Sequence, residues 1–169
     1  MKKTIALAAI VAAAGLANAD TLVIDVSGLE SWDFQGDANN MIMSVMLGAG
    51  STISNIAWDV NLTTFGVSWA EENTMGFFGN SEVVTPGFGD AFTVSNANYS
   101  GSQASSIVID GSGILDIEAY EVGFDDNIDD IDSIYEAGST VTISGTFVPT
   151  PGSLAVLGLG GLVAGRRRR

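Results

Sequence analysis

Apolar and polar residues alternate through most of the chain between residues 20 and 147. Apolar side chains recur at every second position in several short runs, with polar or small side chains between them. Because successive side chains of a β-strand point to opposite faces, this rhythm predicts strands with one buried face. The runs cover residues 22–26, 41–47, 56–62, 65–69, 75–77, 92–94, 107–109 and 141–147.

Residues 114–124 are apolar on both faces. Leu115 and Ile117 share one face, whereas Tyr120 and Val122 share the other, so the apolar face changes near Ala119. We interpret this segment as a strand with a β-bulge near Ala119 rather than as a helix. With it, the sequence predicts about eight or nine strands.

Glycine-rich turn signals separate the predicted strands, at intervals typical of a sandwich. They lie at residues 27–28, 36–37, 48–50, 79–80, 86–87, 89–90, 101–102 and 111–113. Strands with one apolar face are buried most simply when two antiparallel sheets pack together. We therefore predict an all-β fold, a two-sheet antiparallel sandwich of jelly-roll or related topology, with residues 20–147 as one domain.

The three tryptophans lie in different contexts. Trp58 and Trp69 are in register with apolar neighbours, which favours a place in the core. Trp32 lies in the loop-like segment 30–34 and is the better candidate for an exposed aromatic ring that stacks on a sugar.

The charges are segregated along the chain. All 20 acidic residues lie between Asp20 and Glu136, and all six basic residues lie at positions 2, 3 and 166–169. A domain without cations does not bind phosphate backbones or anionic lipid, so nucleic acid is excluded as a partner. Mutual repulsion raises carboxylate pKa values, so we expect the domain to become more stable with added salt, or as the pH falls from about 8 toward about 5.

The composition argues against an enzyme. The chain has no His and no Cys, so it has no thiolate nucleophile, no Cys-ligated metal and no histidine base. Its serines have no His or Lys base within residues 20–147, and no catalytic or cofactor-binding motif occurs. Chance pairs among the carboxylates leave a glycoside hydrolase as the third alternative.

The densest acidic segment resembles part of a calcium-binding loop. Four residues fall at the first, third, fifth and twelfth places of the EF-hand template: Asp125, Asn127, Asp129 and Glu136. The sixth place, which needs glycine, is Asp130, and the flanks read as strands. The segment is therefore either a calcium site or a solvated acidic loop. An amphipathic helical turn through its isoleucines is a further interpretation.

Residues 1–19 have the three parts of a secretory signal. Lysines at positions 2–3 precede an apolar run at residues 4–16, and Ala-Asn-Ala follows it. The run is too short for a comfortable membrane span, and signal peptidase accepts this small-x-small ending. We predict cleavage by signal peptidase between Ala19 and Asp20.

Residues 148–169 combine a proline-rich element, a short apolar stretch and four terminal arginines. As a helix the apolar residues 153–165 would extend only about 20 Å, against about 30 Å of bilayer hydrocarbon, so they form a short anchor at best. The basic residues at both ends of the chain stay cytoplasmic by the positive-inside rule, which places residues 20–147 across the membrane.

In this order the three parts resemble the PEP-CTERM sorting signal. The residues that carry the resemblance are Pro149, Thr150, Pro151, Gly152, Arg166, Arg167, Arg168 and Arg169. Thr150 stands where the family usually has Glu, and the resemblance covers the tail alone. It implies processing by an exosortase in a Gram-negative-type cell, and association with the cell surface or extracellular polysaccharide. A plain C-terminal membrane anchor is the alternative.

These observations predict an exported, noncatalytic protein of the cell surface or extracellular matrix. Its expected partners are signal peptidase, an exosortase-type enzyme, the membrane through the tail, and extracellular polysaccharide. Calcium is the one cofactor that the sequence suggests. A carbohydrate-binding module using Trp32, or a calcium-dependent adhesive domain, is the alternative.

Overall fold

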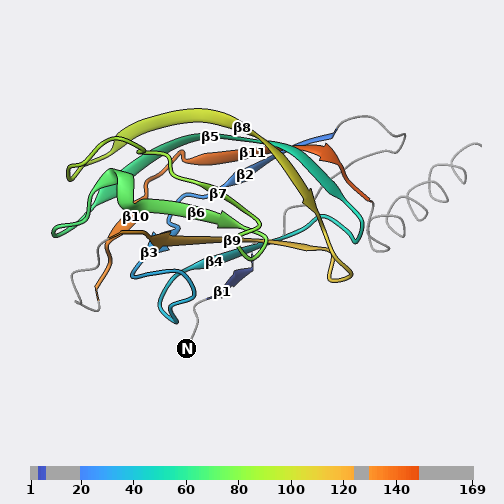
Figure 1. The fold of residues 1–169 in the computed structure, drawn as a ribbon, viewed down its shortest axis with the longest axis horizontal. Coiled ribbons are helices and arrows are strands. Elements are labelled where there is room, and N and C mark those ends of the chain that lie inside the picture. The colour runs from blue at the N-terminus through green and yellow to red at the C-terminus, as the bar shows by residue number, and fades with distance from the viewer. Residues whose placement is uncertain (1–3, 7–19, 124–129, 149–169) are drawn as a thin grey trace, which may run out of the picture.

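The computed structural model describes residues 4–6, 20–123 and 130–148. These residues form two β-sheets packed face to face, as Figure 1 shows. The elements are β1 (Thr4–Ala6), β2 (Asp20–Asp25), β3 (Glu30–Ser31), β4 (Ile42–Met46), β5 (Thr52–Thr64), the 3-10 helix η1 (Ala70–Glu72), β6 (Asn73–Phe77), β7 (Glu82–Val84), β8 (Ala97–Val108), β9 (Ile114–Glu121), β10 (Ser133–Tyr135) and β11 (Thr140–Thr146).

The first sheet is built around the long strand β5. One edge of β5 pairs with β11 and then with β10, and the other edge pairs with β8. The outer strand β2 pairs with β11, and β3 pairs with β10. β2 and β3 lie end to end and act as one strand of the sheet, and so do β11 and β10. The sheet is therefore four strands wide, in the order β2/β3, β11/β10, β5 and β8. The second sheet has the order β1-β4-β9-β6-β7.

The pairing between strands is that of a jelly roll. With β2 and β3 taken as one strand and β10 and β11 as another, the first strand pairs with the last, β4 with β9, β5 with β8, and β6 with β7. All of these pairs are antiparallel. This nesting of early strands with late ones defines a double-sheet jelly roll. The predicted all-β antiparallel sandwich is therefore confirmed.

β1 lies inside the segment that we predict to be removed as a signal peptide. It pairs in parallel with β4, at the edge of the second sheet. A mature chain that begins at Asp20 would lack β1 and keep the four antiparallel strands β4, β9, β6 and β7. The jelly-roll pairing therefore does not depend on β1.

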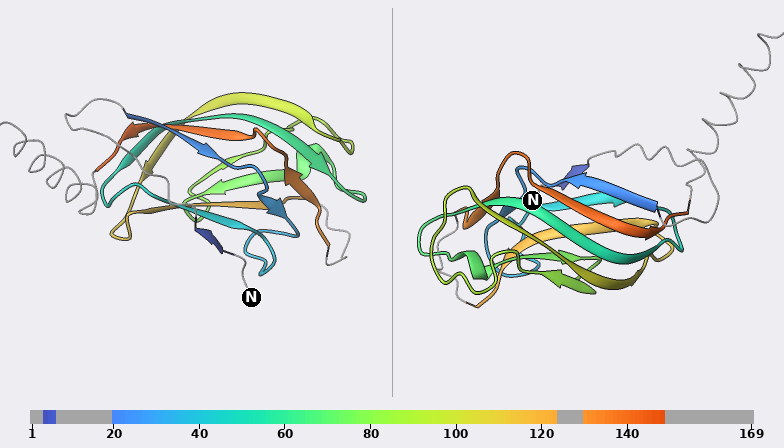
Figure 2. Two further views of the ribbon diagram at one scale, coloured as in Figure 1. Left: turned by 180° about the vertical axis from the view of Figure 1, so that it is seen from behind. Right: turned by 90° about the horizontal axis from the view of Figure 1, so that it is seen from above.

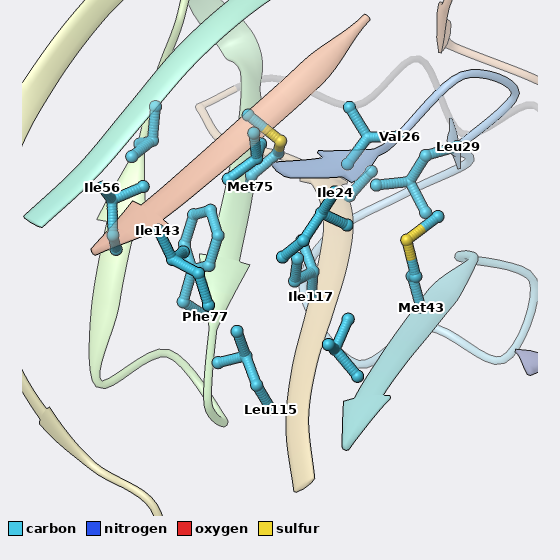
Figure 3. Close-up of a cluster of buried hydrophobic side chains, with 14 of the residues drawn as sticks. Ile24, Val26, Leu29, Met43, Ile56, Met75, Phe77, Leu115, Ile117 and Ile143 are labelled. Carbon is cyan, nitrogen blue, oxygen red and sulfur yellow. The ribbon is translucent and has the colours of Figure 1, made fainter. Parts of the chain in front are cut away.

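The core lies between the two sheets. Alternate side chains from both sheets meet there, as Figure 3 shows for ten labelled residues. Ile56 and Ile143 come from the first sheet, whereas Met75, Phe77 and Ile117 come from the second. All five side chains are fully buried. Apolar packing of this kind stabilises the domain without any disulfide, because the chain has no cysteine.

The connections between strands differ at the two ends of the sandwich. At the short-loop end, tight connections at residues 47–51, 78–81 and 109–113 join consecutive strands. At the long-loop end the described connections are residues 32–41, 65–72 and 85–96, with residues 122–123 and 130–132 at the ends of β9 and β10, and they gather toward the left of Figure 1. The described chain enters β2 and leaves β11 at the short-loop end, because Asp20 pairs with Gly145. Figure 2 shows both ends from two further directions.

Two of the predicted strands are wrong. Residues 65–69 and 92–94 alternate apolar with polar side chains, but they lie in the loops of the long-loop end. Phe65, Val67 and Phe92 are exposed there rather than buried. Apolar and polar residues do alternate in these two segments, but the segments do not form strands with a buried face.

Most of β8 was missed by sequence reasoning, and a turn was predicted at Gly101-Ser102 in its middle. Within the part of the chain that the structure describes, β8 pairs with β5 alone, and polar side chains occupy both of its faces. The strand passes so close to Trp58 that a Cβ atom on Gly101 would lie 2.5 Å from the indole ring. This glycine makes room for a neighbouring side chain and does not mark a turn.

Two smaller predictions are also corrected. β9 runs through Ala119 with an unbroken register against β6, so no bulge lies there. Ile134 belongs to β10, which pairs on both sides with β3 and β5, so the helical turn is wrong for residues 133–135. Backbone pairing to two neighbours overrides the local spacing of the isoleucines. Within the described ranges, no helix is long and apolar enough to cross a bilayer.

Candidate functional site

Exposed aromatic side chains gather at the long-loop end. Five aromatic residues of the described chain are more than two-fifths exposed, and all five lie on the long loops: Phe34, Phe65, Trp69, Phe88 and Phe92. Phe88 is the extreme case, at 87% exposure. Exposed apolar groups that cluster in this way mark a binding surface more often than scattered ones do. We call Phe65, Val67, Trp69, Phe88 and Phe92 the aromatic tip.

Backbone hydrogen bonds tie the two loops of the aromatic tip together. The Ala70 amide donates to the Phe92 carbonyl at 3.1 Å, and the Glu71 amide donates to the Asp90 carbonyl at 3.2 Å. The Trp69 amide donates to Oε2 of Glu72 at 2.8 Å, which caps η1. The aromatic rings are therefore carried on loops whose backbones are held by several bonds.

A hollow lies beside Trp69. Its lining residues are Gly66, Val67, Trp69, Glu72 and Thr93. Its lining residues include an aromatic, an acidic and a hydroxyl-bearing residue, and apolar atoms dominate its lining. Small-molecule sites have this composition, a mostly apolar wall with a few polar groups that fix orientation.

The structure reverses the predicted roles of Trp69 and Trp32. Trp69, predicted to lie in the core, is 43% exposed at the hollow. Trp32, predicted to be the exposed ring, is half-buried, and its Nε1 donates to Oε2 of Glu30 at 3.1 Å. Trp58 packs against the core as predicted. No sequence signal separated Trp69 from Trp58, because both alternate with polar neighbours.

A buried polar cluster lies beneath the long loops. The Tyr135 hydroxyl donates to Oδ1 of Asn73, and Nδ2 of Asn73 donates to Oγ of Ser133. All three residues are fully buried. Burial raises the pKa of Tyr135 well above its ordinary value. The cluster joins β10 to β6, and so joins the two sheets at this end.

Two carboxylates at the same end are also buried. Glu121 is 2% exposed, and its amide donates to the Asp33 carbonyl at 3.0 Å. Asp132 is 5% exposed, and its Oδ1 accepts a hydrogen bond from Oγ of Ser68 at 3.3 Å. The carboxylate that lines the hollow is instead that of Glu72. Sequence reasoning did not single out either buried group, because neither belongs to a recognisable motif.

A tyrosine connects the loop of residues 85–96 to β8. The Tyr99 hydroxyl donates to Oδ2 of Asp90 at 2.8 Å. Burial, together with the bonded and negatively charged Asp90, raises the pKa of Tyr99 to about 12. The neutral phenol therefore holds the loop over the ordinary pH range.

Two exposed aspartates do not follow the expected rise of carboxylate pKa. Hydrogen bonds from the side chain and backbone of Ser27 lower the pKa of Asp25. Bonds from the side chain and backbone of Ser112 lower the pKa of Asp110 in the same way. At these two positions, local bonds to the charged form outweigh repulsion by distant carboxylates.

The predicted calcium ligands are mostly outside the part of the chain that the structure describes. Asp125, Asn127 and Asp129 fall within residues 124–129, which lie outside it. The amide of Glu136 donates to the Asn61 carbonyl at 2.7 Å, at the end of β10. Among residues 4–6, 20–123 and 130–148, no group of three potential metal ligands is found. The calcium site stays a prediction.

The predicted processing residues divide between described and undescribed parts. Asp20 is the first residue of β2, whereas Ala19 lies outside the described residues. The residues of the tail that resemble a sorting signal also lie outside them: Pro149, Thr150, Pro151, Gly152, Arg166, Arg167, Arg168 and Arg169.

Comparison with known proteins adds no family. No protein-family model matches the chain, and no curated protein matches it. Among solved structures, the chain is similar to one described as "Structure of infectious bursal disease virus Gx strain", with 15% sequence identity and a TM-score of 0.27. The match covers 90% of this chain and 52% of that chain, so this chain spans about half of its length.

Proposed function

We propose that this chain is an exported, noncatalytic protein of the cell surface or extracellular matrix, sorted through its exosortase-type C-terminal segment. One observation carries the proposal: the predicted processing boundaries coincide with the boundaries of the jelly roll. β2 begins at Asp20, where signal peptidase is expected to cut. β11 ends at Thr146, and the amide of Val148, the first residue of the predicted tail, donates to Oγ of Ser51 at 2.8 Å.

The positions of the two chain ends suggest how the anchored domain would be oriented relative to the membrane. The described chain enters and leaves at the short-loop end, where Asp20 pairs with Gly145. An anchor that follows residue 148 would hold that end toward the membrane. The aromatic tip, at the opposite end of the strands, would then face outward.

The proposal is tested by following the full chain in a host that carries an exosortase. We expect the exported chain to begin at Asp20 by N-terminal sequencing, and to fractionate with the cell surface. Deletion of residues 149–169 should release it as soluble secreted protein, since the domain then lacks its anchor. Full-length chain that stays in the cytoplasm with residues 1–19 intact would contradict export.

Two controls separate sorting from plain anchoring. In a matched strain without the exosortase, sorting predicts that the chain accumulates in the membrane with its tail intact. Unchanged surface display in that strain would support a plain C-terminal anchor instead. Replacing the four terminal arginines by lysine keeps the charge and should preserve topology, whereas replacing them by alanine should impair it.

A further inference from the structure

The hollow beside Trp69 imposes clear requirements on a ligand. The carboxylate of Glu72 accepts hydrogen bonds and cannot donate them, so a ligand must bring donors of its own. The exposed indole offers a flat apolar face beside it. A ligand that satisfies both groups has an apolar face and a rim of hydroxyl or amino groups.

The negative charge of the domain narrows the class of ligand further. Residues 20–147 contain 20 carboxylates and no Lys or Arg, so an anionic ligand would meet repulsion and find no cation. Glu71, Glu72 and Asp90 add negative charge at the aromatic tip itself. Uronate-rich polymers and anionic lipids are therefore disfavoured. A neutral sugar ring, with C–H faces and O–H donors, meets every requirement.

The site is also held in place before any ligand arrives. The Trp69 amide is bonded to Glu72, and Ala70 and Glu71 are bonded to the loop of residues 85–96. That loop is held in turn by the bond from Tyr99 to Asp90. A pre-organised aromatic ring loses little freedom on binding, which favours affinity.

We propose that the hollow lined by Trp69, Glu72 and Thr93 binds a ring of a neutral extracellular polysaccharide. The sugar face stacks on the indole of Trp69, and sugar hydroxyls donate to Glu72 and bond with the hydroxyl of Thr93. This inference deepens the proposed function, because it names the partner class that the outward end of the domain contacts.

The test is affinity electrophoresis of the purified full chain through gels that contain one polysaccharide each. The neutral probes are glucomannan, galactomannan, xyloglucan and dextran, and the anionic probe is alginate. We expect retardation in at least one neutral gel and none in alginate. Trp69→Ala should weaken binding to the retarding polysaccharide by about tenfold or more, as for other central aromatic contacts. Trp32→Ala is the matched control and should bind as the unmodified chain does.

A second, milder variant separates a loss of sugar binding from a loss of folding. Glu72→Gln retains an acceptor oxygen for the Trp69 amide but removes the charge, so it should weaken sugar binding less than Trp69→Ala does. Thermal melts of each variant confirm that it is folded. No retardation in all four neutral gels, or retardation that Trp69→Ala leaves unchanged, would overturn the proposal.

Other occupants of the hollow give distinct results. Association of the chain with itself in sedimentation, lost in Trp69→Ala and without sugar binding, would assign the aromatic tip to a second copy. Binding to phosphatidylcholine vesicles without sugar binding would assign it to a lipid surface. Either result would overturn the proposal that the hollow binds a polysaccharide. Since the assay uses purified protein, its failure leaves export and sorting untouched, and failure of export leaves a positive gel result standing.

Discussion

The two ends of the jelly roll differ in what holds their loops. At the short-loop end, backbone packs on backbone: a Cβ atom on Gly145 would lie 1.9 Å from the Thr52 carbonyl oxygen, and the Gly48 amide donates to the Gly113 carbonyl. At the long-loop end, side chains add bonds to those of the backbone: the Tyr99 hydroxyl of β8 donates to Asp90, and the carboxylate of Glu72 accepts from the Trp69 amide within its own loop. Thus the short-loop end is held by close backbone packing, while the long-loop end presents exposed side chains that are available to bind a partner.

This division follows from the order of the strands. Short connections leave no room for side chains beyond the turn itself, so they accept glycine and small residues. Long connections must find their own internal contacts, and they carry aromatic residues that the sheets do not need. Exposed aromatic rings on long loops, opposite the entry and exit of the chain, are therefore the part of this molecule best placed to meet a partner.

The largest effect is expected at the short-loop end from Gly145→Ala. The added Cβ would overlap the Thr52 carbonyl and lie 3.0 Å from the Ile53 Cα, and both atoms are backbone within a paired strand. We expect a loss of about 3 kcal/mol or more in the free energy of unfolding, because neither strand can move without breaking the ladder. Urea denaturation measures this loss.

Gly111→Ala is the matched control for that variant. It lies at the same end, and a Cβ atom there would meet nothing within 4 Å. Its stability should stay within about 0.5 kcal/mol of the unmodified chain. Equal losses in both variants would contradict the view that close backbone packing fixes this end.

A smaller but still large effect is expected from Tyr135→Phe beneath the long loops. The change removes the hydroxyl that donates to Oδ1 of Asn73, and leaves a buried acceptor without that donor. We expect a loss of about 2 kcal/mol in the free energy of unfolding, the usual consequence of an unsatisfied buried group. A variant as stable as the original chain would show that the cluster does not join the sheets energetically.

The fold was predictable because the core repeats one simple pattern. Ile24 in β2, Val26 just after it, and Val141 and Ile143 in β11 alternate with polar residues and are buried as expected. Burial of one sheet face leaves this period of two in any sequence. The strand order follows from pairings far apart in the chain, and no local pattern records them.

The candidate site was not predictable, for a related reason. Phe65, Val67 and Trp69 show the same alternation as the core strands, yet they lie on an exposed loop. Whether an apolar face is covered depends on the opposite sheet, which these residues do not meet. Local pattern indicates that a residue is apolar, and only the three-dimensional arrangement decides whether it is buried.

At high pH we expect the long-loop end to weaken first through Tyr99. Its pKa is 10.0 in the unfolded chain and about 12 in the fold, so its stabilisation is complete below pH 10 and lost as the pH rises toward 12. Solvent screening limits the contribution to about 1 kcal/mol. Burial raises the pKa of Tyr120 and Tyr135 as well, so the shape of one curve alone does not isolate Tyr99.

Comparison with Tyr99→Phe isolates the contribution of that residue. At pH 7 the variant should be less stable, because it lacks the hydrogen bond to Asp90. The difference from the unmodified chain, measured by urea denaturation, should shrink as the pH passes from about 10 to about 12. A difference that stays constant over this range would mean that Tyr99 does not titrate while holding the loop.

The smallest effect is expected at low pH and belongs to the short-loop end. Bonds from Ser112 lower the pKa of Asp110 below 3.8, so its stabilisation is present above that pH and lost as the pH falls through the lower value of the fold. Ser112→Ala should lower the Tm slightly at pH 7, by about one degree, because the group is at the surface. At a pH below the lowered pKa of the fold both proteins carry a protonated Asp110, so the difference should shrink there. If it stayed undiminished at that pH, Ser112 would stabilise this turn through the bond that its Oγ accepts from the Ile114 amide at 3.2 Å, and not through the charge of Asp110. The two ends would then differ, since titration of Tyr99 would affect the long loops while titration of Asp110 did not affect this short one.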